Sequence, residues 1–471
     1  MAAAALDRCY KAYDVRAVYP DPLSEEVAYR TGFATAQFLA ERTQATGFSG
    51  AMCRHVVVGH DMRKSSPKLV AALKRGIRAY GLGVVDVGMV DTPFVYFAIN
   101  HLGACGGVQV TASHNPAHYN GFKISQAHAK PVGMGSGLER VKELAQADAA
   151  APGSDVDITG IEAKQDLWKP YRDHLLKRLD SRVLDGSVTL KIAVDASNGM
   201  AGTAMPRVCD GVAGLDLARI NFDNSTGEFV HEPNPLVEAN LAQTREAVAK
   251  TGAHFGVCFD GDADRCMIVD EQGTPVGCDL LLAALVKDAL KDSPGAAIVY
   301  DLRSSRAVRE AIEAAGGVPV ESRVGHVFMK ARLAETAAPI GGELSGHFYF
   351  ADMWNTDSGL RAFLAVCSMV AREGKPLSQL IAPFRKYAQS GEVNFKTDDT
   401  AKALERLLAK YPSAQVTKLD GVSLDVGDWW CNVRASNTEP LLRLNLESAS
   451  AALTGAKLHE VGALLGERVD H

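Results

Sequence analysis

Short apolar runs rich in β-branched residues alternate with longer amphipathic stretches over most of the chain. In the first part, the stretch from Pro67 to Tyr80 has helical periodicity, and the apolar runs are HVVVG at 55–59, GVVDVG at 83–88 and GGVQVT at 106–111. Strand-like and helix-like segments in alternation are typical of βαβ units. The pattern therefore predicts an α/β domain in the N-terminal part.

The same alternation occurs twice more before the pattern changes. A helical stretch from Leu241 to Thr251 lies between LKIAVDASNG and AHFGVCF, and one from Ser305 to Ala315 lies between AAIVYD and VPVES. The last part instead has three strand-like runs, VSLDV, WWCNVR and LLRLNLES, and then a helical stretch from Gly455 to Gly466. We therefore expect three similar α/β domains and a smaller α+β domain at the C-terminus.

Three breaks in this pattern divide the chain. Residues 145–157 are small and acidic with few large apolar side chains, which suits a surface connection. Weaker breaks lie near residues 273–278 and 390–399. The domains are accordingly expected at residues 1–160, 161–277, 278–388 and 389–471.

The composition is that of an ordinary globular protein. The 471 residues are 47% hydrophobic and 23% charged, and the formal net charge of -6 disfavours a surface for nucleic acid or for an anionic membrane. Charged residues come too early for a signal peptide, and the most apolar run, 280–286, is too short to span a bilayer, so we expect a cytoplasmic protein. Nine cysteines without C-x-x-C spacing predict buried, reduced thiols. The expected partner is a small molecule.

The stretch TASHNPAHYNGFK, at 111–123, places Ser113 at the expected end of a buried strand, where open α/β sheets bind ligands. One interpretation is a reactive serine. The alternative is a turn in which Ser113 and Asn115 bond to backbone amides ahead of Pro116. A hydrolase dyad with His114 is disfavoured, because neighbours on an extended strand point to opposite faces and no G-x-S-x-G elbow is present.

The segment VCFDGDADRCMIVD places Asp260, Asp262 and Asp264 at alternate positions between two strand-like runs. Three carboxylates at this spacing can converge on one hard divalent cation. An EF-hand is disfavoured, because its sixth loop position would be Arg265 instead of glycine and because the flanks read as strands. An acidic, solvated turn remains an alternative. A Mg²⁺ site is the preferred interpretation, and it implies a phosphorylated ligand.

Two further polar stretches suit a phosphorylated sugar. RASNTEP, at 434–440, gathers a guanidinium, two hydroxyls and an amide, which are donors that a phosphate dianion accepts. GGELSGH, at 341–347, can present the carboxylate of Glu343 and the hydroxyl of Ser345 to sugar hydroxyls. Either stretch alone is compatible with a polar turn. The glycine-rich GMGSG at 133–137 follows no strand-like run, and no G-x-x-x-x-G-K-[ST] sequence occurs, so nucleotide binding is disfavoured.

Taken in order, TASHNPAHYNGFK, DGDADRC, GGELSGH and RASNTEPLLRLNLE resemble the α-D-phosphohexomutase superfamily, and within it the bacterial phosphomannomutase/phosphoglucomutase group. The resemblance covers essentially the whole chain, since YKAYDVR, VGHDMRKSSP, DVGMVDTP, VDASNG, HEPNP and VGH also take part. It implies a four-domain phosphohexomutase-like architecture, with three mixed-sheet α/β domains and an α+β domain around a central cleft.

The resemblance also implies a role for each matching residue. Ser113 would carry a phosphoryl group, and Asp260, Asp262 and Asp264 would hold one Mg²⁺ per chain against it. The implied catalytic residues are Ser113, Lys123, His326 and Arg16, of which Lys123 and His326 would handle protons. The implied substrate-binding residues are Tyr13, Arg265, Arg303, Gly325, His326, Glu343, Ser345, Arg434, Ser436, Asn437 and Thr438, with His114 and Asn115 in support.

The implied activity is reversible phosphoryl transfer between C1 and C6 of a phosphohexose. It would proceed through a phosphoserine and a glucose or mannose 1,6-bisphosphate, which is both intermediate and activator, in a monomer or homodimer. Leu344 is close to the methionine usual in the mannose/glucose enzymes, where the glucosamine branch more often has glutamine, so phosphoglucosamine mutase is the alternative. Arg303 stands where many members have lysine, which leaves its ring contacts open. A Mg²⁺-dependent sugar phosphatase is less favoured, because it does not need a second phosphate-binding site such as residues 434–438.

Overall fold

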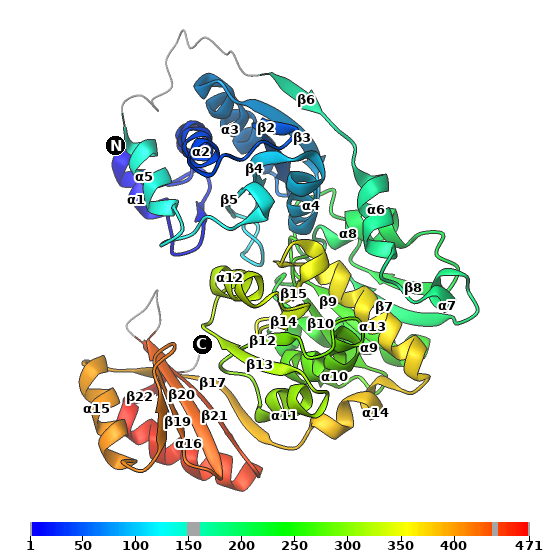
Figure 1. Cartoon of the computed structure of the whole chain (residues 1–471), viewed down its shortest axis with the longest axis vertical. Helices are drawn as coiled ribbons and strands as arrows, with labels where there is room; N and C mark the ends of the chain where they lie inside the picture. The colour runs from blue at the N-terminus through cyan, green and yellow to red at the C-terminus, as the bar shows by residue number, and fades with distance from the viewer. Residues whose placement is uncertain (1, 148–160, 436–440, 470–471) are drawn as a thin grey trace. The chain divides into compact units, whose positions relative to one another are not determined.

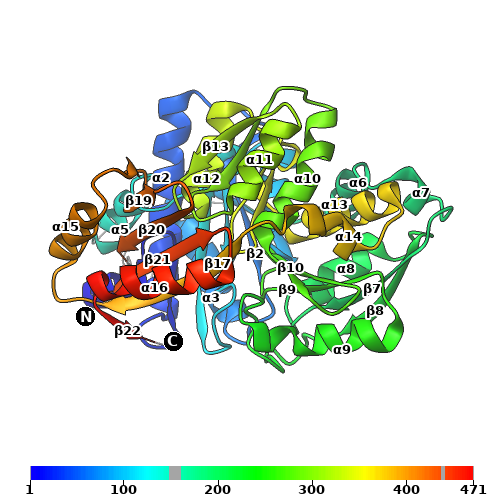
Figure 2. The ribbon, with the colours of Figure 1, turned by 90° about the horizontal axis from the view of Figure 1, so that it is seen from below.

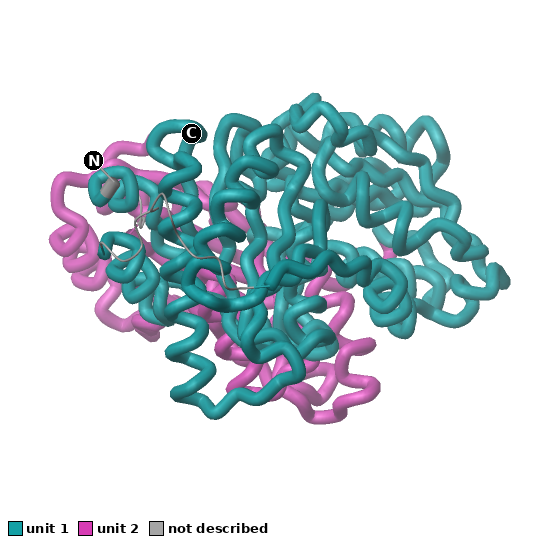
Figure 3. The backbone as a smooth tube through the Cα atoms, turned by 90° about the horizontal axis from the view of Figure 1, so that it is seen from above, with its two compact units in different colours: residues 1–276, 345–378 teal, residues 277–344, 379–471 magenta. Residues whose placement is uncertain are grey.

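The computed structural model describes residues 2–147, 161–435 and 441–469 (Figure 1). The chain divides into two compact units, shown in different colours in Figure 3. Unit 1 comprises Met1–Val276 and Ser345–Ser378, and unit 2 comprises Gly277–Leu344 and Gln379–His471. Each unit has its own buried apolar core.

The first sheet of unit 1 has the strand order β1-β5-β4-β2-β3-β6. Strand β2 is parallel to β3 and β4, β3 is parallel to β6, and β5 is antiparallel to β1 and β4, so the sheet is mixed. The three strands and the helix that the sequence predicts here are confirmed as β2, β3, β4 and α3. The strands are β1 Val15–Val18, β2 Met52–His60, β3 Gly83–Met89, β4 Ala104–Val110, β5 Tyr119–Gln126 and β6 Glu162–Lys164, and the helices are α1 Ala2–Cys9, α2 Glu25–Thr46, α3 Ser66–Tyr80, α4 Thr92–Leu102, η1 Ala127–Ala129 and α5 Leu138–Gln146.

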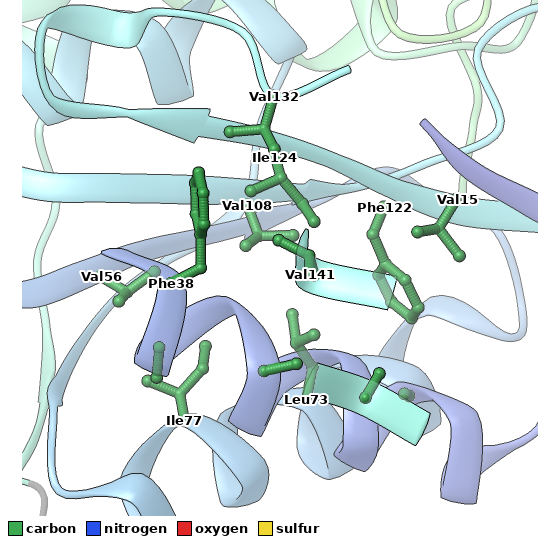
Figure 4. Packing of buried hydrophobic residues seen from close by; sticks show 14 of the residues in the cluster. Val15, Phe38, Val56, Leu73, Ile77, Val108, Phe122, Ile124, Val132 and Val141 are labelled. Atoms are coloured by element: carbon green, nitrogen blue, oxygen red, sulfur yellow. The ribbon is translucent and has the colours of Figure 1, made fainter. Parts of the chain in front are cut away.

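Helices α2 and α3 cover this sheet and approach each other closely. A Cβ atom at Gly32 would lie 2.2 Å from the carbonyl oxygen of Leu73, and one at Gly76 would lie 2.0 Å from that of Tyr29, so neither helix tolerates a larger residue at the crossing. Figure 4 shows apolar side chains of the helices and strands directed toward one another in this core. Full burial of each large apolar side chain contributes about 1.5 to 3 kcal/mol.

The second sheet of unit 1 has the order β11-β10-β9-β7-β8. Strand β7 is parallel to β8 and β9, whereas β10 is antiparallel to β9 and β11. Helix α9 packs on β7 and β9 (Figure 2). The elements are α6 Trp168–Leu176, α7 Ser181–Leu184, β7 Leu190–Asp195, α8 Ala201–Cys209, β8 Leu215–Ile220, η3 Glu238–Leu241, α9 Ala242–Thr251, β9 Phe255–Phe259, β10 Cys266–Asp270, β11 Pro275–Val276, β15 Phe348–Phe350, η4 Ala351–Met353, β16 Thr356–Asp357 and α13 Gly359–Glu373.

In unit 2, β12 is parallel to β13 and β14, and the C-terminal sheet β18-β19-β20-β21-β17-β22 is antiparallel. Helices α15 and α16 share the core of the C-terminal sheet, and Figure 2 shows α16 along β21 and β17. The sequence break near residues 390–399 falls largely within β17, so this segment is a strand. The elements are α10 Cys278–Lys291, β12 Ala297–Asp301, α11 Arg306–Ala314, β13 Val318–Ser322, α12 His326–Thr336, β14 Ile340–Gly342, η5 Ala382–Phe384, β17 Ala388–Lys396, α15 Thr400–Lys410, β18 Gln415–Thr417, β19 Val422–Asp425, β20 Trp429–Ala435, β21 Leu441–Ser448, α16 Ala451–Leu465 and β22 Glu467–Val469, with α14 Leu377–Ile381 at the change of unit.

Two predictions about the whole chain can be compared with these elements. All nine cysteines are free thiols, eight of them buried and Cys53 half-buried, as predicted. Among the described residues, no helix combines the length and the apolar character that crossing a membrane requires.

Candidate active site

Ser113 lies in the loop that follows β4, with a positive φ of 51° and almost no exposure. Because Ser113 is not extended, the prediction that His114 faces the opposite side is wrong: His114 Nδ1 lies 3.3 Å from Ser113 Oγ. Arg265 Nη2 donates to the same Nδ1 atom at 2.9 Å. The charge of Arg265 and burial together lower the pKa of His114 well below its usual value, so His114 is neutral, and its Nδ1 already accepts the hydrogen bond from Arg265 instead of a proton from Ser113.

Arg63 fixes the shape of this loop, and sequence reasoning gave it no role. Its guanidinium is fully buried and donates to the carbonyl oxygens of Ser113 at 2.9 Å and Asn115 at 2.7 Å. It also donates to the carbonyl of Pro116, and its Nε donates to Asp61 Oδ2 at 2.9 Å. A planar fork of donors suits several converging carbonyls. The only sequence signal was its place in VGHDMRKSSP, which the family resemblance includes.

The three aspartates of DGDADRC lie in the tight loop between β9 and β10, and all are buried. Asp260, Asp262 and Asp264 each offer a carboxylate oxygen within 4.8 Å of the other two. Within the described part of the chain, Oδ1 of Asp262 and Oδ1 of Asp264 have no hydrogen-bond partner. Burial and the two neighbouring carboxylates raise the pKa of Asp260 well above its ordinary value. Clustered, buried and incompletely bonded carboxylates fit a hard divalent cation.

Ser113 and Lys123 contact this cluster, although they precede its aspartates by 137 or more residues in the sequence. Ser113 Oγ donates to Asp260 Oδ2 at 2.9 Å. Lys123 Nζ lies 2.7 Å from Asp262 Oδ2 and 2.5 Å from Asp264 Oδ2. Burial acts to lower the pKa of Lys123, but the charges of the aspartates outweigh it and raise this pKa, so Lys123 is an ammonium ion here. A serine hydroxyl, three carboxylates and a cation therefore share one buried site.

Other residues of unit 1 surround this group. Arg16, in β1, donates to Asn115 Oδ1 at 2.6 Å and pairs with Asp14, and Tyr13 lies just before β1. The Nε of Arg265 lies 3.7 Å from Asp260 Oδ2. Ser345 is half-buried. The carbonyl oxygen of the next residue, Gly346, accepts a hydrogen bond from the backbone N–H of Cys266 at 3.3 Å. This bond holds the segment beside the aspartate loop.

Two residues next to the aspartates were missed by sequence reasoning. Thr92, the first residue of α4, donates through Oγ1 to Asp262 Oδ2 at 2.5 Å. His347 Nδ1 lies 2.7 Å from Asp357 Oδ2 and 3.7 Å from Asp264 Oδ1. Both belong to quoted motifs, DVGMVDTP and GGELSGH, but only the folded chain shows that they face the acidic loop.

Unit 2 carries the remaining predicted residues. Glu343 Oε1 accepts the backbone N–H of Gly325 at 2.8 Å, next to His326 at the start of α12. Arg303 is buried and pairs with both oxygens of Asp301, at 3.1 Å and 2.7 Å. Ser436, Asn437 and Thr438 lie outside the described residues.

Glu392, in β17, is a carboxylate surrounded by three arginines of unit 2, and sequence reasoning missed it. Its carboxylate accepts from Arg434 at 2.6 Å, from Arg443 at 3.3 Å and from Arg303 at 3.4 Å. Burial acts to raise the pKa of Glu392, but the charges of Arg434, Arg303 and Arg443 hold it below its ordinary value. Three guanidinium groups around one carboxylate form a place where an anion is stabilised.

Comparisons with known proteins agree with this arrangement. Family models described as phosphoglucomutase/phosphomannomutase match in order: alpha/beta/alpha domain I at residues 7–148, domain II at 169–273, domain III at 278–387 and the C-terminal domain at 392–461. The expected fold, three α/β domains with mixed sheets and a C-terminal domain with a mainly antiparallel sheet, is confirmed.

Relatives resemble the chain over nearly its full length. A protein of Xanthomonas campestris pv. campestris named "Phosphohexose mutases" is 39% identical over 97% of this chain and 98% of its own. The "Phosphomannomutase" of Escherichia coli K12 is 36% identical over 98% and 99%. The crystal structure of a phosphoglucomutase/phosphomannomutase family protein from Burkholderia thailandensis has a TM-score of 0.85 and 31% identity, over 97% of this chain and 96% of its own. The chain therefore belongs to the phosphoglucomutase/phosphomannomutase family of phosphohexomutase enzymes.

Proposed function

We propose that this enzyme moves a phosphoryl group reversibly between the C1 and C6 oxygens of a hexose phosphate, through a phosphoserine at Ser113 and a hexose 1,6-bisphosphate. The observation that carries the proposal is the 2.9 Å contact of Ser113 Oγ with Asp260, in a cluster of carboxylates closed by Lys123. The names of the relatives support the same class of reaction.

A cation belongs to the proposal because the three aspartates carry more negative charge than Lys123 balances. Asp260, Asp262 and Asp264 would hold one Mg²⁺ per chain together with the Ser113 phosphate, and the ion would supply charge neutralisation at the phosphoryl oxygens. The carboxylate oxygens without hydrogen-bond partners support this assignment.

In the first half-reaction, the Oγ–P bond of phosphorylated Ser113 breaks as a bond forms between phosphorus and the free hydroxyl oxygen of the sugar. His326 would take the hydroxyl proton, and Lys123, an ammonium ion here, would give a proton to the departing Oγ. In the second half-reaction, the other phosphate of the bisphosphate returns to Ser113. Positioning and charge stabilisation suffice for such a transfer, so no strongly activated serine is needed.

The arginine cluster of unit 2 supports a role in holding the non-reacting phosphate. Arg434 would grip it together with Ser436, Asn437 and Thr438, since a guanidinium fork matches phosphate oxygens. Glu343 and Ser345 would bond to the ring hydroxyls, and Tyr13, Arg16, Arg265, Arg303 and Gly325 would complete substrate binding. Binding energy at the distal phosphate can hold the reacting hydroxyl in line.

The preferred substrates are mannose and glucose phosphates, because Leu344 resembles the methionine usual in enzymes for those sugars. Phosphoglucosamine is the alternative substrate. We also assign domain limits at residues 1–160, 161–277, 278–388 and 389–471, and each family-model match falls within one of these ranges.

The test follows mannose, glucose and glucosamine 1-phosphates by phosphorus NMR, with catalytic bisphosphate and Mg²⁺ present. We expect the 6-phosphate to form without inorganic phosphate, and intact mass to show one phosphoryl group that Ser113→Ala lacks. Ser187→Ala, on the surface of the same unit, is the matched control. Release of inorganic phosphate without a 6-phosphate would identify a phosphatase, and full turnover by Ser113→Ala would refute the phosphoserine.

A further inference from the structure

A second group of metal-binding side chains lies in unit 1, apart from the aspartate cluster. Asp195 ends β7, Cys258 is in β9, and the two are register partners in the parallel pairing of these strands. His231 comes from the segment after β8. One carboxylate oxygen, one imidazole nitrogen and the thiol sulfur all lie within 4.8 Å of one another. Oxygen, nitrogen and sulfur donors thus meet at one place.

Hydrogen bonds orient two of these donors. Asp195 Oδ1 accepts the backbone N–H of Ser197 at 2.9 Å and the amide of Asn221 at 3.0 Å, which leaves Oδ2 directed at His231 Nε2, 3.3 Å away. His231 Nδ1 lies 2.9 Å from the carbonyl oxygen of Glu232, which can only accept, so Nδ1 carries a proton. A histidine fixed in this way by a backbone carbonyl is typical of metal ligands, and so is a hydrogen-bonded carboxylate.

We propose that Asp195, His231 and Cys258 bind a borderline divalent ion such as Zn²⁺. Carboxylate and imidazole ligands at about 2.0 to 2.1 Å in a tetrahedral site are about 3.3 Å apart, which is the observed separation of Asp195 Oδ2 and His231 Nε2. Sulfur and nitrogen donors select Zn²⁺ over Mg²⁺. The thiol binds as the thiolate and its proton passes to solvent.

His231 connects this group of side chains with the surface. Asp195 and Cys258 are fully buried, whereas the side chain of His231 keeps 13% of its exposure and offers an entry from the surface. Thr244 Oγ1, 3.3 Å from Asp195 Oδ2, is a neutral oxygen at the edge of the site and can complete the coordination, as can water. Three protein ligands with a neutral oxygen in the fourth position give the four-coordinate arrangement that zinc takes in proteins.

An ion pair between imidazolium His231 and Asp195 is the competing explanation of the 3.3 Å contact. In that arrangement Cys258 takes no part, and replacing Cys258 does not change the spectrum of added Co²⁺. The two explanations therefore differ in the participation of sulfur.

The experiment uses the full chain, stripped with a chelator and titrated with Co²⁺ alone. We expect one equivalent to give the sulfur-to-cobalt charge-transfer band of a thiolate ligand, which carboxylates of the aspartate cluster cannot produce. Zn²⁺ should displace this Co²⁺ and raise the unfolding temperature. Cys258→Ser should lose the band, and His231→Gln should weaken Co²⁺ binding at least about tenfold. Cys209→Ser, another buried free thiol in the same unit, is the control and should keep both.

Co²⁺ binding without a thiolate band, or a band that persists in Cys258→Ser, would overturn the proposal. His231→Gln changes a partly exposed side chain, so it tests the site even where a buried substitution disturbs folding. The readouts are spectroscopic and thermal, and they are independent of whether the enzyme is a mutase.

Discussion

Replacing Lys123 by methionine removes one charge from the centre of the aspartate cluster and keeps most of the side-chain volume. Lys123 Nζ is bonded to Asp262 and Asp264 at 2.7 Å and 2.5 Å, and both carboxylates are buried. In Lys123→Met without metal, three carboxylates remain together with one cation fewer. We expect the loop between β9 and β10 to be strongly destabilised.

Two independent arguments give the size of the effect. Removing one partner from a buried ion pair costs about 3 to 5 kcal/mol. The carboxylates can instead neutralise themselves by taking up a proton, and for an aspartate with an ordinary pKa of about 3.9 this costs about 4 kcal/mol at pH 7. Both routes predict that the loop opens more easily by about 4 kcal/mol. Bound Mg²⁺ supplies positive charge at the same place and should recover most of this loss.

Hydrogen exchange measures the effect, because a chain of two units does not have one defined unfolding free energy. Amides of residues 255–270 would be compared in wild type and Lys123→Met, with chelator and with Mg²⁺. Lys169→Met is the control, since Lys169 pairs with Asp173 at 2.6 Å but both side chains are exposed, and such pairs contribute less than about 1 kcal/mol.

Two results would refute this reasoning. Equal protection of wild type and Lys123→Met in chelator would mean that the aspartates do not need the ammonium group. An equal loss with and without Mg²⁺ would mean that Lys123 acts through packing instead of charge.

Three shorter predictions concern other parts of the chain. Burial raises the pKa of Asp91 to about 7, although Tyr171 donates a hydrogen bond to it. The folded protein therefore binds this proton more tightly than the unfolded chain does. Up to about 4 kcal/mol of stability is lost as the pH rises from about 4 through 7. Asp91→Asn should flatten that part of the stability profile of unit 1, and an unchanged slope would contradict the pKa shift. Ala337 ends α12 with a φ of 51°, so Ala337→Gly should raise the free energy of opening of α12 by about 1 kcal/mol in hydrogen exchange, and a decrease would contradict the argument from strain. Glu392→Gln removes the anion beside Arg434, so inorganic phosphate should bind about tenfold tighter by calorimetry, and weaker binding would mean that Glu392 positions the arginines.

The alternation of apolar and polar residues predicted strands well where they are buried on both faces. Strands β4 and β9 are buried along their whole length; β9 reads as a continuous apolar run, and β4 is interrupted only by Gln109. Helix α2 gave no comparable signal, because residues from Val27 to Leu39 are buried on most sides and rich in Ala, Thr and Gly, so no polar face stands out. Strand β17 was read as a break, since Ser390 and Gly391 interrupt it where its register with β21 shifts.

The residues of the candidate site also divide into those that the sequence predicts and those that only the folded chain reveals. Residue types and spacing sufficed to predict that Asp260, Asp262 and Asp264 come together, because carboxylates in one short loop are local in sequence. The roles of Arg63 and Glu392 were not predictable, since Arg63 reaches the Ser113 loop 50 residues away and Glu392 reaches Arg434 42 residues away. The orientation of His114 was predicted wrongly because Ser113 has a left-handed backbone conformation, which no feature of S-H-N-P requires.

Strand β9 connects the aspartate cluster with the proposed Zn²⁺ ligands, because Cys258 lies two residues before Asp260. Their donors differ in hardness, so each group prefers a different ion: oxygen alone suits Mg²⁺, and sulfur with nitrogen suits Zn²⁺. We expect an ion bound to Cys258 to fix the end of the strand from which the aspartate loop starts, and therefore to change the affinity of that loop for Mg²⁺. Linkage makes this coupling reciprocal, so Mg²⁺ changes the affinity for Zn²⁺ by the same factor as Zn²⁺ changes the affinity for Mg²⁺.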